Sequence, residues 1–562
     1  MSSSSTVARG AAIIAAGTLT SRLLGWLREK LLLSTFGASF ITGAYNSAFS
    51  VPDLLYYLLA GGALSAAFIP VFSDFLAKKQ PEDANRTGSS IANLMLLALI
   101  AGVALELIFA PYVVRLVAPG YAPGTQEFQL TVYLTRVMCG MVIFTAMSGL
   151  LTGMLNSYHH FLAPTVVWNT YNIGIILGIT VFSKWSIFGG SPAHPSIVGV
   201  AAGVMVGALS MALIQIPVVM KYGFRYSCII DLAHAGTKRV LQLFAPVMVG
   251  LSLSQLNLQM IPLMIGSIAG TTAVTDIRAA NRIVLLPLGI FAVAISTAAF
   301  PRLSQLAALG ETQEFRRTIS SALRAILLLS IPSAMMIFVL ATPMTCLLWG
   351  GGKFGMEDIR AASFTLAFFI WVLLALGAIQ LINRAFYSLQ DTFTPVIVGV
   401  IMVLLNIPTG LFFVKYTPLA YGGVAFSTTA TTTVFTIVLF ELLRRRLGGI
   451  DGRALLTTTL KICAASVAMA VVVYLIAYRL APVLADGTHL SPIYRLHWHA
   501  PAITANKTLN ELGELKIPVR KVVVQIGASM IAGLLVYLLA LWAMGVEELS
   551  LVTARFRKKA RI

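Results

Sequence analysis

Long apolar segments constrain this chain more than any other feature. Blocks of about 20 or more apolar residues recur along almost its whole length, and about 20 such residues form a helix that crosses a hydrocarbon core. Only 11% of the 562 residues are charged, whereas soluble domains carry roughly 25%. The sequence therefore predicts an all-α polytopic membrane protein.

The apolar blocks divide into fourteen predicted transmembrane helices. The second is long for one crossing, and Pro52, Gly61 and Gly62 interrupt it, so we expect it to tilt or bend. The spans are 9–36, 43–74, 89–117, 128–154, 162–183, 197–220, 240–268, 275–300, 318–347, 361–388, 394–414, 421–443, 454–481 and 520–544.

Basic residues predict the orientation. Lys and Arg gather in alternate loops, such as Lys78–Arg86, Lys221–Arg239 and Arg444–Arg453, and in the C-terminal tail. Short cytoplasmic loops carry such an excess, so both termini are expected in the cytoplasm. The net charge of +19 is thereby explained without nucleic acid, for which no basic stripe with exposed aromatics is present.

An internal duplication predicts the domain organisation. Several residues recur 231 positions later and in the same order, among them Pro70 as Pro301, Ser157 as Ser388 and Pro164 as Pro395. Six spans separate the copies, so both enter the membrane the same way round. We expect an N-terminal six-helix lobe (1–222), a parallel C-terminal six-helix lobe (223–446), and a C-terminal helix pair (447–562) with an outer loop, 482–518. Substrate sites in such proteins lie between the halves; a duplication kept only for packing is the alternative.

No cofactor or metal site is expected. The four cysteines are far apart, and the histidines of the outer loop (His489, His497 and His499) lack a carboxylate or cysteine at ligand spacing. A folded loop is the simpler interpretation.

Charged residues inside the first span are candidate binding groups. Ionisable side chains in a membrane helix are costly and mark functional sites by default. Arg22 and Glu29 share a helical face, whereas Arg28 lies about 120° from Arg22. Both arginines can face one cavity if that face is broad or Gly25 bends the helix. Cavity lining is favoured for Arg22, and snorkelling is its alternative.

Other charges interrupt the later spans. Arg282 lies in an apolar stretch, and Arg384 lies nearer a cytoplasmic end; Asp53, Glu106 and Arg136 are further buried candidates. Asp53 could neutralise an arginine or form a simple ion pair. Guanidinium groups bind phosphate oxygens bidentately, and the apolar surroundings suit a lipid tail. The combination favours a phosphate-linked lipid as substrate.

Several motifs resemble the MurJ/MviN family of lipid II flippases, across nearly the whole chain. They are Ser21-Arg22-x-x-Gly25-x-x-Arg28-Glu29, Phe36-Gly37-Ala38, Val51-Pro52-Asp53-Leu54-Leu55, Ala66-x-Phe68-Ile69-Pro70, Ala118-Pro119-Gly120, Ala280-x-Arg282, Lys353-Phe354 and Phe386-Tyr387-Ser388-x-Gln390-Asp391-Thr392-x-Thr394-Pro395.

The resemblance implies a flippase of the multidrug/oligosaccharidyl-lipid/polysaccharide exporter superfamily in the bacterial cytoplasmic membrane. Its two lobes face a V-shaped cavity, and the last two spans form a groove for the polyprenyl chain. Alternating access then carries the pyrophosphate-sugar head group outward for cell-wall synthesis. Arg22, Arg28 and Arg282 match the head-group cations, with Glu29 at an acidic position. The resemblance also implies coupling to the membrane potential or an ion, and partners in cell-wall synthesis.

Four positions depart from the family pattern. The family has a carboxylate at Gly43, an arginine at Tyr56, and glutamates at Gly61 and Leu285. These changes leave open whether the substrate is lipid II or another polyprenyl-pyrophosphate-linked glycan. A small-molecule exporter, a non-transporting scaffold and a membrane enzyme are weaker alternatives. No gathered acids, bases or metal ligands favour the enzyme.

Overall fold

The computed structural model describes residues 3–59, 63–244, 256–450, 452–482, 490 and 518–546. Within them every regular element is helical, apart from one isolated bridge between Gly351 and Phe354. The chain forms two compact units that divide between Thr275 and Asp276, and each is considered by itself. The predicted all-α class is confirmed for the described residues.

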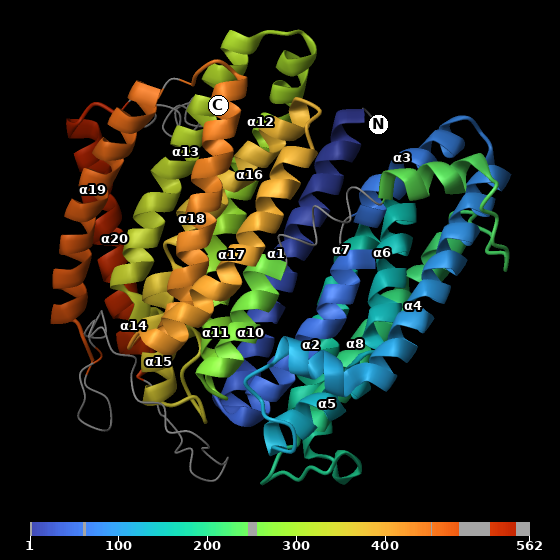
Figure 1. The fold of residues 1–562 in the computed structure, drawn as a ribbon, viewed down its shortest axis with the longest axis horizontal. Coiled ribbons are helices and arrows are strands. Elements are labelled where there is room, and N and C mark those ends of the chain that lie inside the picture. The colour runs from blue at the N-terminus through green and yellow to red at the C-terminus, as the bar shows by residue number, and fades with distance from the viewer. Residues whose placement is uncertain are drawn as a thin grey trace. The chain divides into compact units, whose positions relative to one another are not determined.

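The first unit contains helices that are blue to green in Figure 1. They are α1 (Ser3–Phe36), α2 (Phe40–Leu59), α3 (Ala63–Ala77), α4 (Pro81–Val117), α5 (Gln126–Met138), α6 (Met141–Ser157), α7 (Leu162–Thr180), α8 (Ile197–Lys221) and α10 (Ile261–Ala269), with the short elements η1 (Phe182–Lys184), η2 (Ser186–Phe188) and η3 (Leu256–Met260). The unit has two apolar cores, one around Phe68, Phe72 and Met154 and one around Phe36, Met138 and Val200.

The second unit contains the later helices, drawn from green to red (Figure 1). α11 (Ala273–Pro287) begins just before the division. It is followed by η4 (Leu288–Ala292), α12 (Val293–Ala308), α13 (Thr312–Val339), α14 (Ala341–Leu348), α15 (Met356–Phe369), α16 (Val372–Ser388), α17 (Phe393–Tyr416), α18 (Tyr421–Arg446), α19 (Gly452–Arg479) and α20 (Val519–Ala543).

Ten described helices are long and apolar enough to cross a membrane, or eleven if the bent pair α15–α16 is one span. The remaining predicted spans are 9–36, 43–74 and 240–268. α1 covers the first, but its side chains up to residue 15 lie outside the described part of the chain, and the other two spans also contain residues outside that part. The count of fourteen stays a prediction. α2 continues through Pro52, so that proline does not interrupt the helix as expected. Gly61 and Gly62 lie outside the described residues, and the expected tilt or bend of the second span stays a prediction.

Helix boundaries repeat with the offset found in the sequence. α6 begins at Met141 and ends at Ser157, and α16 begins and ends 231 residues later, at Val372 and Ser388. The starts of α4 and α7 recur in the same way as the starts of α13 and α17. The turn after α6 has a positive φ of 58° at His159, and the turn after α16 has 59° at Gln390. The two copies therefore share turns as well as helices.

Glycines form the seam between α7 and α8. A Cβ added to Gly174 would lie 2.4 Å from the Cα of Gly207, and one added to Gly203 would lie 2.5 Å from the Cα of Gly178. Small residues four positions apart let membrane helices approach until their backbones touch. The sequence thus specifies close backbone packing here.

We expect Gly203→Val to destabilise the protein by roughly 3 kcal/mol, because a branched side chain would have to displace backbone rather than a flexible side chain. Thermal unfolding of detergent-purified protein measures the change. Gly102→Val is the matched control, since a Cβ at Gly102 meets nothing within 4 Å. An unchanged melting temperature for Gly203→Val would contradict close backbone contact between α7 and α8 at this position.

Candidate functional site

Arg28 is the best-anchored charge of α1. Its Nη1 donates to the Oδ1 of Asn172 at 3.0 Å, and its Nη2 lies 3.7 Å from a carboxylate oxygen of Glu29. The side chains of Arg28 and Glu29 are only 15% and 5% exposed. A guanidinium held in this way keeps its orientation while further N–H groups remain for a ligand.

Asn172 on α7 fixes this arrangement. Its Nδ2 donates to the backbone oxygen of Trp168 at 2.9 Å and contacts the backbone oxygen and hydroxyl of Ser21 at 3.3 and 3.4 Å. One buried amide therefore holds α1 at two points about two turns apart, Ser21 and Arg28. Sequence reasoning missed Asn172; the available signal was an amide side chain inside an apolar span, a signal that Asn169 on the same helix also gives.

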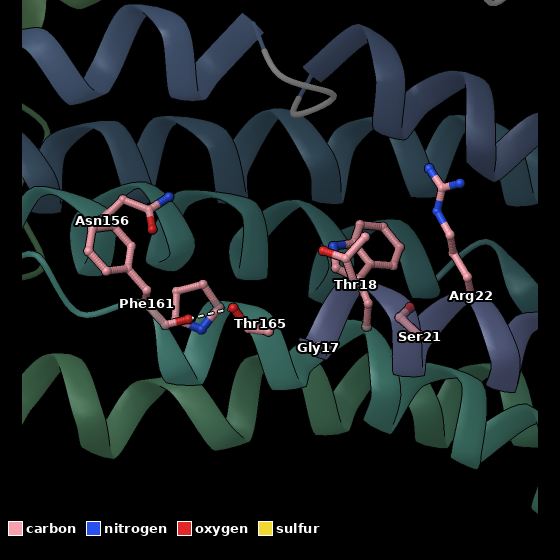
Figure 2. Close-up of a pocket in the computed structure, with 9 residues that line it drawn as sticks. Gly17, Thr18, Ser21, Arg22, Asn156, Phe161 and Thr165 are labelled. Carbon is pink, nitrogen blue, oxygen red and sulfur yellow. Dashed lines mark hydrogen bonds between the residues drawn. The ribbon is translucent and has the colours of Figure 1, made fainter. Parts of the chain in front are cut away.

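Arg22 lies one and a half turns earlier on α1 and is exposed. It lines a pocket of about 410 Å³ with Gly17, Thr18, Ser21, Asn156, Phe161, Pro164, Thr165 and Trp168. Figure 2 shows its side chain extended from α1, with the guanidinium pointing away from Ser21 and Thr18. The pocket thus combines one cation with hydroxyl, amide and aromatic groups. Gly25 does not break α1, which is continuous from Ser3 to Phe36.

Tyr56 stands where the family pattern has an arginine. Its ring meets the ring of Trp168 edge to face, with centroids 6.4 Å apart, and Trp168 meets Tyr171 in the same way at 6.2 Å. An aromatic side chain therefore packs against Trp168 in the wall of the pocket. Asp53, one turn earlier on α2, is half-buried.

Gly43 stands where the family pattern has a carboxylate. A Cβ here would lie 2.2 Å from the backbone oxygen of Thr271 and 2.9 Å from the hydroxyl of Tyr121. Next to it, the hydroxyls of Thr42 and Thr275 are 3.1 Å apart. The chain between α10 and α11 therefore packs directly on the start of α2, and this leaves no room for a side chain at position 43.

Arg282 belongs to the second unit. It is half-buried on α11, one turn after Arg278 and one turn before Leu285. Asp276 on the same helix is 1% exposed. The grouping of Arg282 with Arg22 and Arg28 around one head group stays a prediction.

The other predicted charges are dispersed. Arg384 lies over the ring of Phe300, with 6.0 Å between the guanidinium carbon and the ring centroid. Glu106 is buried as expected, but Arg136 is exposed, so its assignment as a buried candidate is wrong. Its Nε donates to the backbone oxygen of Leu107, which allows the charged end to remain at the surface. No three potential metal ligands gather among the described residues.

The motif around Asp391 forms a turn between α16 and α17. Its carboxylate accepts hydrogen bonds from the backbone N–H and the hydroxyl of Thr394, at 3.0 and 2.8 Å, and it pairs with Arg446 at the end of α18. Burial opposes ionisation, but these hydrogen bonds and the positive charge outweigh it and lower the pKa of Asp391. The motif thus caps α17 and ties it to α18.

This lowered pKa predicts a pH-dependent contribution to stability. A carboxyl group whose folded pKa lies below its unfolded value, about 3.9, stabilises the fold above that pH and loses the contribution as the pH falls. We expect Asp391→Asn to lower the free energy of unfolding by roughly 1 kcal/mol at neutral pH, the usual cost of losing a helix cap. The difference from wild type should shrink below about pH 4.

Thermal unfolding of both proteins between pH 3 and pH 7 checks this. Asp74→Asn is the matched control, since Asp74 pairs with Lys78 on an exposed surface and should contribute little. A difference between Asp391→Asn and wild type that stays constant down to pH 3 would rule out the ionised pair.

Comparison with known proteins places this geometry in a class. The fold is similar to a solved structure described as "Lipid II flippase MurJ, inward closed conformation", with a TM-score of 0.73 and 22% identity, over 96% of this chain and 100% of that one. It is also similar to an inward-facing multidrug resistance MATE family transporter of the MOP superfamily, with a TM-score of 0.62 and 15% identity, over 76% of this chain and 94% of that one. This chain therefore shares the fold of these two solved proteins.

The sequence comparisons narrow the class to one family. A family model for "Lipid II flippase MurJ" matches residues 32–493. A "Probable lipid II flippase MurJ" of Buchnera aphidicola is 28% identical over 88% of this chain and 95% of its own length. The "Lipid II flippase MurJ" of Burkholderia cenocepacia is 29% identical over 76% of this chain and 82% of its own. The chain belongs to the MurJ family of lipid II flippases, as its motifs predict, and is a multi-pass protein of the bacterial inner membrane.

Proposed function

We propose that this chain flips lipid II, the lipid-linked peptidoglycan precursor, from the inner to the outer leaflet of the cytoplasmic membrane by alternating access. Family membership over residues 32–493 supports the substrate. The substrate supplied to the outer leaflet would be consumed by cell-wall synthesis, whose enzymes are the expected partners.

The observation that carries the proposal is the anchored guanidinium of Arg28. Asn172 and Glu29 hold it inside the first unit, where a charge without a binding role would be costly. Bidentate hydrogen bonds to phosphate oxygens are the strongest use of such a group. The pyrophosphate of a polyprenyl-linked glycan is a ligand of that chemistry. Arg22, in its open pocket, would supply a second cation.

The proposed architecture has fourteen spans, with six-helix lobes over 1–222 and 223–446, a further helix pair over 447–562, and both termini in the cytoplasm. Helix boundaries that repeat after 231 residues support the two parallel lobes. In a V-shaped cavity between them, Arg282 would join Arg22 and Arg28, with Glu29 and Asp53 as the acidic partners. Membrane potential or an ion would drive the cycle.

Another polyprenyl-pyrophosphate-linked glycan is the second candidate substrate. Gly43, which has no room for a side chain, and the aromatic Tyr56 favour this second substrate. Both residues change the charge around the head group relative to the family pattern. Leu285, which stands where the family pattern has a glutamate, also favours a different head group.

Complementation tests the proposal. The chain is expressed in bacteria depleted of their own lipid II flippase, and lipid II in the outer leaflet is quantified. We expect restored growth and restored export. Well-inserted protein that exports no lipid II would reject this substrate and favour the second candidate, which flipping assays with other polyprenyl-linked glycans would then identify.

A further inference from the structure

Glu106 is a buried carboxylic acid in the middle of a membrane helix. It lies on α4 and is 4% exposed, whereas Leu105 and Ile108 beside it are 56% and 67% exposed. The helix therefore turns this one charged group toward the protein interior and its apolar neighbours toward lipid. Neither carboxylate oxygen of Glu106 has a hydrogen-bond partner.

Among the residues that the structure describes, no cation pairs with Glu106. α4 packs against α2, α3, α5, α6 and α10, and α6 and α10 contain no titratable residue. Arg136 on α5 is exposed, and its Nε is bonded to the backbone oxygen of Leu107. Cys139 donates to the backbone oxygen of Arg136 at 3.0 Å. The other titratable side chains described on these elements, none of which bonds Glu106, are Tyr45, Asp53, Tyr56, Asp74, Glu127 and Tyr133.

The second repeat shows that packing does not require a carboxyl here. The residue 231 positions after Glu106 is Ile337, which is 8% exposed. Arg136 and Cys139 correspond to Ala367 and Ile370. Apolar residues therefore fill these three positions in the second copy, so packing does not explain the polar side chains of Glu106, Arg136 and Cys139 in the first copy.

An ionised carboxylate without a partner loses its hydration in an apolar interior, and this cost is so large that such a group takes up a proton instead. Buried acids of this kind serve as proton relays in membrane transporters. We propose that Glu106 is a proton-binding site, neutral in the state described here, whose proton is exchanged with water during the transport cycle. In that exchange the carboxyl O–H bond breaks, the proton passes to water and a carboxylate remains. The coupling to transport rests on the proposed function, whereas the protonation does not.

Infrared spectroscopy tests the protonation directly. In the difference spectrum between wild type and Glu106→Gln at neutral pH, we expect a carbonyl band of a protonated carboxylic acid that only the wild type carries. Glu82→Gln is the matched control, because Glu82 lies on the same helix and is exposed, and it should leave that band in place. Absence of the band from wild type would overturn the proposal, whatever substrate the chain moves.

Transport in liposomes tests the coupling. With lipid II as the probe and the membrane potential clamped at zero, a pH gradient should change the wild-type rate by up to about tenfold per pH unit, the change in proton concentration. The ratio of the rates with and without the gradient should fall to one in Glu106→Gln. A wild-type rate that ignores the gradient, or a variant that still follows it, would overturn the coupling. A wild-type chain that moves no lipid II at all would instead reject the proposed substrate.

Discussion

Replacing Arg28 with alanine should lower the rate of lipid II flipping by about tenfold to a hundredfold and abolish complementation. Hydrogen bonds to a charged group contribute roughly 1.5–3 kcal/mol each, and this guanidinium is held ready for a ligand by Asn172 at 3.0 Å. The rate is measured as the appearance of lipid II in the outer leaflet, normalised to the amount of inserted protein.

Two variants control this result. Arg28→Lys keeps the charge but loses the planar fork, so its rate should be intermediate. Lys78→Ala removes an exposed cation that pairs only with Asp74 and should leave the rate unchanged. Well-inserted Arg28→Ala that flips lipid II at the wild-type rate would remove Arg28 from the binding site.

Restoring the family's carboxylate through Gly43→Asp should inactivate the protein rather than improve it. A Cβ at this position would lie 2.2 Å from the backbone oxygen of Thr271, and real Cβ atoms are not found so close. The state in which α2 packs against this segment would become inaccessible, and a cycle that passes through it would stop. We expect complementation to be lost in well-inserted protein.

Gly43→Ala separates the steric cause from the electrostatic one. Alanine brings the same Cβ without charge, so it should be as inactive as aspartate. Gly355→Ala is the matched control, because a Cβ there meets nothing within 4 Å. Activity of Gly43→Asp at or above the wild-type level would mean that the position is open and that charge decides the outcome.

The sequence predicted the helices well because span length and apolar character are local properties. Every predicted span falls on described helices or on a segment that is described in part, and the predicted offset of 231 residues separates the bounds of α6 from those of α16. The breaks were not predictable in this way. The helix is interrupted at Cys139–Gly140, between α5 and α6, and the helix axis bends by 45° between α15 and α16. The apolar sequence continues through both breaks and gives no sign of them.

The site was predicted only where one segment carries it. Arg28 and Glu29 were both named from α1 alone, but the helical spacing placed Glu29 on the face of Arg22, so its pair with Arg28 was not predicted. Asn172 could not be predicted, because an amide in an apolar span gives no sign of its partner 144 residues away. The meaning of Gly43 was equally hidden, since the backbone that occupies its side-chain space comes from the segment after α10.

The glycine seam also limits which parts of the first unit can slide. Side chains that interlock can change rotamers and let two helices shift, but backbones in contact through Gly174, Gly178, Gly203 and Gly207 have no such freedom. We therefore expect α7 and α8 to move as one rigid body. Asn172 belongs to this rigid pair of helices and is hydrogen-bonded to Ser21 and Arg28 of α1. A displacement of α1 along α7 would therefore break the hydrogen bond that orients the guanidinium of Arg28. The orientation of the Arg28 guanidinium thus depends on the position of α1 relative to the α7–α8 pair.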